Sequence, residues 1–364
     1  MRSRDFRFLL FPLAVAALGG CASSLTLNAF REDSAFCYDR AREPQTPVVD
    51  AHLHFRPFGG PALAFEEVVS YLQRSGVRFV TVMGIGQTLP ANSTCTYYLR
   101  CPGTPVAPTL KNDIANAEAF VTRKRPGIHM VLSMTFPDLA RPDSVLRGMQ
   151  LLDTEFPGTF HWMGEVNLVK QALFDNGHEP VTAAQLAGWG AFMEVLRARN
   201  MPIAIHADLG NDEDPTAYLP LIEEMLAAYP GNAVIWMHMG LSRELVRMDP
   251  QRHVGILKSL LDRYPRLMLD LSWRVIDENY FADARSRSHY VAFLNEYSER
   301  VLPGTDFVAS RRQTFAKYQD DLEVTGRIYK YLDDGAFRNI ALGQNYFDLL
   351  GLDYRAPPLC NRRP

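Results

Sequence analysis

The sequence lacks any long run of lysine or arginine, and its formal net charge is −3 over 364 residues. Proteins that bind nucleic acid through its phosphates usually carry a basic stretch or patch, so a polyanion partner is not expected. Gly-x-Ser-x-Gly and the P-loop motif are also missing, and no Gly-x-Gly-x-x-Gly follows the first strand-like run. These absences argue against a serine hydrolase, a P-loop nucleotide enzyme and a dinucleotide-binding fold.

Cysteine is scarce, with five residues in the chain, and no two of them have Cys-x-x-Cys spacing. A zinc site built from cysteines is therefore not expected. The first cysteine ends MRSRDFRFLLFPLAVAALGGC, in which an arginine-bearing start precedes an apolar segment from Phe8 to Leu18. That segment has the pattern of a secretory signal and is too short to span a membrane. Its ending, Leu18-Gly19-Gly20-Cys21, resembles a bacterial lipobox; an ordinary cleaved signal is the alternative.

The lipobox resemblance implies that Cys21 carries a lipid that anchors the protein to the bacterial cell envelope, facing the periplasm. Ala22 after the cysteine favours the outer membrane. Such a compartment is oxidising, so we expect the remaining cysteines to form disulfides, although free buried thiols are the alternative. The preferred pairing joins Cys95 with Cys101, which flank a short polar loop. It also joins Cys37 with Cys360, which lie near opposite ends of the mature chain.

Apolar runs alternate along the chain with longer segments of helical periodicity. Eight runs, most followed by a helix candidate, favour a single-domain α/β fold, the (β/α)8 TIM barrel. The alternative is an open doubly wound sheet, which has fewer strands and often a glycine-rich first turn. The expected plan is a signal peptide (1–20), a tether or strap (21–46), the barrel (47–354) and a C-terminal tail (355–364). The runs occupy residues 47–55, 78–85, 128–136, 161–169, 202–210, 232–240, 267–275 and 301–307.

A long insertion, residues 86–108, follows the second run. In a barrel it would lie at the carboxyl ends of the strands, where active sites are built. Loops of this length are usually functional or mobile, and the expected Cys95–Cys101 disulfide favours an ordered lid.

Two histidines on the first run suggest a metal site. Side chains alternate along a strand, so His52 and His54 point to the same face, with Asp50 in phase but deeper in the barrel. Two neutral imidazoles on one face can bind a divalent ion of the zinc or manganese class. Asp50 is more consistent with orienting the histidines than with binding the metal.

Four later runs carry a polar residue near the carboxyl end: Glu165, His206, His238 and Asp306. Each alone can be a hydrogen-bonded core residue or a helix cap. Together they would bury many ionisable groups at one end of the barrel, which is costly without a partner of opposite charge. We therefore predict one or two divalent ions, zinc first and manganese second.

These strand-end motifs resemble those of the amidohydrolase superfamily, in its amidohydrolase-related (amidohydrolase 2) branch, with a layout similar to TatD-like hydrolases. The resemblance runs from Pro47 to Asp353 and implies a metal-dependent TIM-barrel hydrolase. Its motifs are DAHLHF, IAIHADLG, VIWMHMGLS, LDLSW, GTDF and the closing GQNYFDLLGL.

By this resemblance His52, His54, His206 and Asp306 would be metal ligands, and His238 would ligate a second ion or polarise the substrate. Many members carry a carbamylated lysine on the fourth strand that bridges two metals. Here Glu165 stands at that place, which favours a bridging carboxylate, although a supporting role and a single ion remain alternatives. Lys170 follows five residues later, which predicts a place past the end of the strand.

The chemistry expected of this set is hydrolysis of an amide, ester, lactone or phosphoester bond in a small periplasmic molecule. A divalent ion lowers the pKa of a bound water to about 7. Asp306 could accept the proton, and His238 could stabilise the oxyanion. The alternatives are a metal-dependent decarboxylase of the same superfamily and a non-catalytic lipoprotein that binds a metal or ligand.

Four further positions could contact the substrate. Arg56 and Arg274 follow strand motifs and could meet an anionic group, or could be solvated charges. Trp273, with Tyr97 or Tyr98, could line an apolar pocket, although core packing is the default for aromatic residues.

Overall fold

The computed structural model describes residues 25–43 and 47–360. The expected signal peptide and the lipidation site Cys21 lie outside the described residues. No helix within these two ranges is long and apolar enough to cross a bilayer.

Every one of the eight apolar runs forms a strand, and the strands are parallel neighbours in one sheet. Most of their side chains are buried, because runs rich in Val, Ile, Leu and Met are covered on both faces. The strands are β1 (Val49–His54), β2 (Phe79–Met83), β5 (His129–Met134), β6 (Phe160–Val169), β7 (Ile203–Ala207), β8 (Val234–Trp236), β9 (Leu267–Asp270) and the two short pieces of the eighth run, β10 (Val301–Leu302) and β11 (Phe307–Val308).

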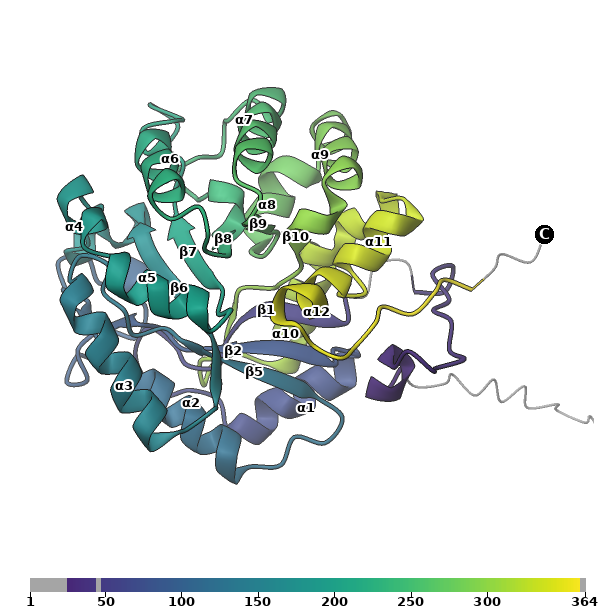
Figure 1. Ribbon diagram of the computed structural model, residues 1–364, viewed down its shortest axis with the longest axis horizontal. Coiled ribbons are helices and arrows are strands. Elements are labelled where there is room, and N and C mark those ends of the chain that lie inside the picture. The colour runs from purple at the N-terminus through teal and green to yellow at the C-terminus, as the bar shows by residue number, and fades with distance from the viewer. Residues whose placement is uncertain (1–24, 44–46, 361–364) are drawn as a thin grey trace, which may run out of the picture.

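The eighth run closes the barrel. Its first piece, β10, pairs with β9, and its second piece, β11, pairs with β1. Between them the backbone N–H of Asp306 donates to the carbonyl of His52 at 2.8 Å. The strands therefore form a ring surrounded by helices (Figure 1), which confirms the predicted single-domain (β/α)8 barrel over the open sheet.

Helices follow the strands and bury their apolar stripes against the outside of the barrel. In α7, Asp249 caps the N-terminus, Pro250 takes the first position, and Leu257 and Leu261 face inward. The barrel helices are α1 (Phe65–Ser75), α2 (Lys111–Thr122), α3 (Val145–Glu155), α4 (Ala183–Ala187), α5 (Gly190–Ala198), α6 (Leu219–Ala228), α7 (Pro250–Arg263), α8 (Arg274–Ile276), α9 (Ala284–Glu296) and α10 (Phe315–Gly326), followed by α11 (Asp334–Ile340) and α12 (Gln344–Leu350).

The amino end of the barrel is closed by the two ends of the described chain. Phe30, in the 25–43 segment, is fully buried, with its ring centroid 5.0 Å from Phe79 at the start of β2 and 5.9 Å from Phe347 in α12. The predicted Cys37–Cys360 disulfide is present, and it ties this segment to the tail. Residues 25–43 thus lie across the barrel as a strap.

The insertion at 86–108 is an ordered loop beside the carboxyl ends of the strands. Its two arms pair as β3 (Gln87–Thr88) and β4 (Ala107–Pro108), and the predicted Cys95–Cys101 disulfide closes its tip. Tyr98 packs on Phe58 with ring centroids 4.5 Å apart, as part of a small separate apolar cluster. The insertion is therefore fixed next to the strand ends that carry the predicted site.

Candidate active site

The two β1 histidines present the same nitrogen to the interior. His54 Nδ1 lies 2.5 Å from the carbonyl of Gly84, and His52 Nδ1 lies 2.8 Å from Ser272 Oγ. A carbonyl oxygen only accepts hydrogen bonds, so Nδ1 of His54 carries the proton and Nε2 keeps its lone pair. The Ser272 hydroxyl donates to Asp270, so its oxygen accepts from Nδ1 of His52. His52 therefore has the same tautomer as His54. The two Nε2 atoms lie 3.0 Å apart, and this orientation is the one that metal-ligating histidines need.

Asp306 completes a triangle with these nitrogens. Its Oδ1 lies 3.5 Å from His52 Nε2 and 3.3 Å from His54 Nε2. Nitrogen and oxygen ligands about 2.0–2.2 Å from a tetrahedral zinc stand about 3.4 Å apart. The spacing and the chemistry of these three side chains therefore fit a zinc-class ion with a remaining open position.

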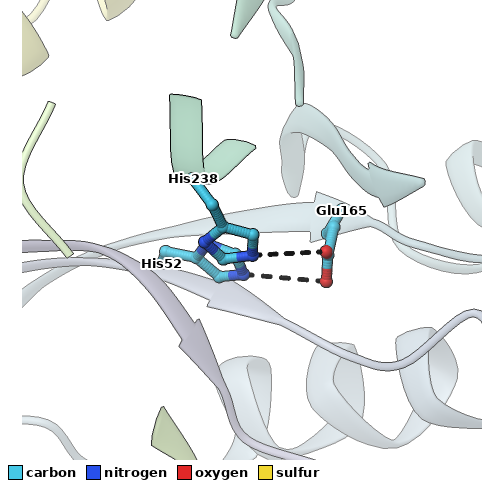
Figure 2. Close-up of side chains that lie close together, drawn as sticks. All are labelled: His52, Glu165 and His238. Atoms are coloured by element: carbon cyan, nitrogen blue, oxygen red, sulfur yellow. Dashed lines mark ion pairs between the residues drawn. The ribbon is translucent and has the colours of Figure 1, made fainter. Parts of the chain in front are cut away.

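Glu165 and His238 form a second group with His52 (Figure 2). Glu165 Oε2 lies 3.7 Å from His52 Nε2, and Glu165 Oε1 lies 3.8 Å from His238 Nε2. The His238 ring stacks on His52 with centroids 5.2 Å apart, and its Nδ1 lies 3.1 Å from the Ser272 carbonyl. Within the described ranges, this group and the His52–His54–Asp306 group are those that could hold an ion.

His206 is the predicted ligand that the structure leaves outside both groups. Its Nε2 lies 2.9 Å from Asp208 Oδ1, and its Nδ1 is in close contact with Glu165 Oε1. His206 therefore contacts the centre through Glu165, and its Nδ1 faces the same space as that carboxylate oxygen.

Lys170 directly follows Val169, the last residue of β6, so it lies past the strand end as predicted, yet its side chain enters the site. Its Nζ is 3.0 Å from Glu165 Oε1 and 3.3 Å from His206 Nδ1, and the residue is 8% exposed. Strict alternation would point residues 165 and 170 to opposite faces. The pairing of β6 with β7 is irregular between Asn167 and Val169, and this shift returns Lys170 to the face of Glu165.

Three buried polar residues that sequence reasoning missed support the ligand set. Asp208 holds His206, while Asp270 accepts from the Ser272 hydroxyl, which in turn contacts His52. A signal was available: Asp208 stands two residues after His206, and Asp270 two before Ser272, so each pair shares a strand face. Beyond a strand end, however, an aspartate is equally typical of a turn.

Burial raises the pKa of both carboxyls at the centre, and neighbouring positive groups outweigh it. The charge of Lys170, 3.0 Å away, holds the pKa of Glu165 well below its usual range. For Asp306, the neighbouring His54 and His52 rings bring the pKa to about 2. Both side chains are therefore carboxylates at neutral pH, as anionic ligands must be.

Asp50 lies beneath the site and positions backbone. Its Oδ1 accepts from the Thr305 N–H at 2.9 Å, and its Oδ2 accepts from the Thr305 hydroxyl at 2.8 Å and from Tyr318 at 3.1 Å. The His52 N–H also approaches it at 3.4 Å. Burial raises the pKa of Asp50 to about 6, despite these hydrogen bonds. The residue thus joins β1 to the turn before Asp306 and does not contact the imidazole rings.

A cavity of about 490 Å³ opens above the centre. Trp273, Tyr97 and Tyr98 line it as predicted, with Phe58. The same cavity is also lined by Lys170, His206, His238 and Asp306. A small molecule bound there would meet both the ligand set and an aromatic surface.

The two arginines expected to meet an anionic substrate have other partners. Arg274 lines the cavity, but its guanidinium lies 2.7 Å from both Glu278 and Asp320. Arg56 donates to the Asn116 side chain and to the Ala115 carbonyl, each at 3.1 Å, and is not among the residues that line the cavity. Packing on α2 therefore draws Arg56 away from the site, in contrast to the prediction.

Four residues adopt a positive φ at the strand ends around this cavity: His238 (56°), Met239 (54°), Trp273 (81°) and Asp306 (57°). Such backbone costs on the order of 1–3 kcal/mol per residue and tends to cluster at functional sites. Here it turns His238, Trp273 and Asp306 toward one space, which marks these strand ends as the functional end of the barrel.

Comparison with solved structures agrees with this architecture. A dihydroorotase from Campylobacter jejuni aligns over 85% of this chain and 84% of its own, with 13% identity and a TM-score of 0.51. An amidohydrolase from Burkholderia multivorans with bound zinc aligns over 84% and 99%, with 12% identity and a TM-score of 0.52. An apo protein from Agrobacterium tumefaciens aligns over 85% and 96%, with 16% identity and a TM-score of 0.52. At these identities the likeness shows the fold.

The sequence itself matches one family model. Among curated proteins, none is significantly similar in sequence to this chain. The amidohydrolase family model matches residues 130–342, which is more than half of the chain and includes Glu165, His206, His238 and Asp306. The chain therefore belongs to the amidohydrolase family of metal-dependent hydrolases, which confirms the prediction made from its strand-end motifs.

Proposed function

We propose that this protein hydrolyses an amide, ester, lactone or phosphoester bond in a small molecule, with a divalent ion held by His52, His54 and Asp306. The observation that carries the proposal is the triangle of Nε2, Nε2 and Oδ1 atoms with edges of 3.0, 3.5 and 3.3 Å, whose Asp306 member lines a cavity. The ion would supply Lewis acidity and would lower the pKa of a bound water to about 7. Zinc suits nitrogen and carboxylate ligands at this spacing, and manganese is the second choice.

Asp306 is the residue that can take the proton from the attacking water. Its side chain keeps 18% exposure and lines the cavity, whereas the side chain of Glu165 keeps 5%. With a pKa of about 2, Asp306 is an ionised acceptor at neutral pH. A carboxylate that accepts the proton from water can then return it to the leaving group.

His238 and Trp273 shape the substrate side of the centre. The Ser272 carbonyl engages Nδ1 of His238, so Nε2 is the atom that this residue offers to the centre or to the substrate. The Trp273 ring lies 5.0 Å from the His238 ring and forms an apolar wall beside it. We assign His238 to the polarised oxygen of the substrate and Trp273 to its apolar part.

Measuring turnover of a broad panel of candidate substrates tests this function. Purified protein dialysed with zinc or manganese should hydrolyse at least one class among esters, lactones, amides and phosphoesters, and chelation should abolish the rate until metal is restored. Binding without turnover across the whole panel would favour the non-catalytic alternative. Release of carbon dioxide from a carboxylated substrate, with no hydrolysis, would favour the decarboxylase.

We further propose that the enzyme works in the periplasm, anchored through a lipid on Cys21. The two disulfides support an oxidising compartment. Expression in a bacterial host should place the protein in the outer-membrane fraction, with a lipid-modified N-terminal peptide that begins at Cys21. The Cys21→Ser variant should instead be released as a soluble periplasmic protein. Equal membrane association of the wild type and this variant would contradict the lipid anchor.

A further inference from the structure

Glu165 contacts different groups through its two oxygens. Oε2 lies 3.7 Å from His52 Nε2 and 3.3 Å from His54 Nε2, on the side of the proposed ion. Oε1 faces Lys170 Nζ at 3.0 Å and is in close contact with His206 Nδ1. A carboxylate placed in this way can serve one cation through each oxygen.

Lys170 already occupies the second of these positions. Its Nζ lies within hydrogen-bond distance of both Glu165 Oε1 and His206 Nδ1, at 3.0 and 3.3 Å. The other nitrogen of His206 is held by Asp208, so Nδ1 is the atom that His206 could offer to an ion on this side. The two ligand atoms that a second ion would use are therefore hydrogen-bonded to an ammonium group.

We propose that the Lys170 ammonium replaces a second divalent ion, so that this centre holds one ion per chain. The inference rests on the proposed function, because it assigns the other half of the same centre. A buried lysine needs a carboxylate partner, and Lys170 pairs with Glu165 at 3.0 Å, while Asp208 and Asp306 line the same cavity. A divalent ion at the same acceptor atoms would be repelled by the ammonium at a few ångströms in a partly desolvated site.

The contacts of Lys170 also distinguish it from a bridging carbamate. A carbamylated lysine is an anion and would place negative charge directly against the Glu165 carboxylate. Lys170 Nζ instead donates to that carboxylate, and the two residues form a buried ion pair with side-chain exposures of 9% and 5%. Because Lys170 also lines the cavity, its fixed positive charge faces the substrate.

Metal counting tests this inference independently of turnover. Full-length mature protein is dialysed to equilibrium against excess Zn²⁺, and bound zinc per chain is measured by mass spectrometry of the metal. The wild type should hold one ion. Lys170→Met removes the charge and keeps the length, so its count should rise to two. Lys317→Met is the matched control, because Lys317 lines the same cavity but pairs with Asp321, and its count should stay at one.

Cobalt adds a spectroscopic readout. Wild-type protein loaded with Co²⁺ should give the magnetic resonance signal of an isolated ion, and Lys170→Met should show coupling between two ions. Lys170→Ala serves as a second variant. If neither variant folds, the number of ions bound per wild-type chain decides the inference. Two ions in the wild type, or one ion in the folded lysine variants, would overturn the inference alone. A wild type that binds no ion would overturn the proposed function as well, whereas one ion without turnover leaves the inference supported.

Discussion

The two ends of the barrel are built from opposite kinds of side chain. At the amino end the rings of Phe30, Phe79, Phe347 and Tyr354 form a packed cluster with neighbouring centroids 4.6–5.9 Å apart, and the partly buried His129 ring lies at its edge. At the carboxyl end, imidazoles, carboxylates and one lysine are buried together. The aromatic end gains free energy from apolar burial, whereas the polar end is favourable only when its charges find partners.

This contrast separates stability from function. Residues with positive φ and buried charges store unfavourable free energy at the carboxyl end, and the packed amino end helps to hold that arrangement in place. Variants at the polar end should therefore change catalysis and metal affinity more than folding, and variants at the aromatic end should do the reverse.

The largest effect is expected for Asp306→Asn at the polar end. Loss of the proton acceptor should lower kcat by about 10²–10⁴-fold, the usual contribution of a positioned general base. The measurement is the rate with a substrate found in the panel, together with the metal count. Asp353→Asn is the control, because that side chain is almost fully exposed. A wild-type rate in Asp306→Asn would remove this residue from the mechanism.

At the aromatic end, Phe347→Ala should lower the free energy of unfolding by about 3–5 kcal/mol, because it removes a large, fully buried ring and leaves a cavity. Urea unfolding should show a lower midpoint, and activity at 25 °C well below the transition should be unchanged. Phe174→Ala, on a residue 37% exposed, is the matched control. If Phe347→Ala instead abolished activity in the folded enzyme, the separation between the two ends would fail.

A buried histidine on α7, His253, should make stability depend on pH. Burial lowers the pKa of His253 from its usual 6.5 to about 4, and its ring is held between Tyr290 and the Met239 carbonyl. The folded state favours the neutral ring, so stability is present above pH 6.5 and is lost as the pH falls toward 4. The difference corresponds to about 3 kcal/mol.

Urea titrations between pH 4 and 7 measure this term. His253→Gln should flatten the loss of stability at low pH, although His178, whose pKa burial also lowers to about 4, keeps part of it. His289→Gln makes the same change on a partly exposed residue of α9 as a control. An unchanged slope in His253→Gln would show that its burial does not govern the acid side.

The fold was predictable because each strand is a short, nearly uninterrupted apolar run whose side chains are buried on both faces of the sheet. The strand-end histidines and acids could also be found, since in a barrel the carboxyl ends of the strands converge. The side-chain directions beyond those ends could not. Arg56 lies two residues past the end of β1, yet its contact with Asn116 turns it toward α2.

Lys170 shows the same limit from the other side. Its place depends on an irregular register between β6 and β7, which a regular period of two along the sequence does not contain. Pattern reasoning can therefore locate the strand that carries a site, whereas local departures from ideal geometry decide which of its last residues enter.

The smallest effect is expected where the polar end is supported indirectly. Ser272 Oγ lies 2.8 Å from His52 Nδ1 and donates to Asp270, so Ser272→Ala should leave the ligand in place but poorly oriented. Loss of such a supporting hydrogen bond typically weakens metal affinity by about 10–100-fold. Competition with a chelator measures the affinity, and urea unfolding should change little by comparison. Ser144→Ala, on an exposed serine, provides the control. Equal losses of stability and affinity in Ser272→Ala would show that this hydrogen bond holds the barrel itself, and the two ends would then not be as independent as their composition indicates.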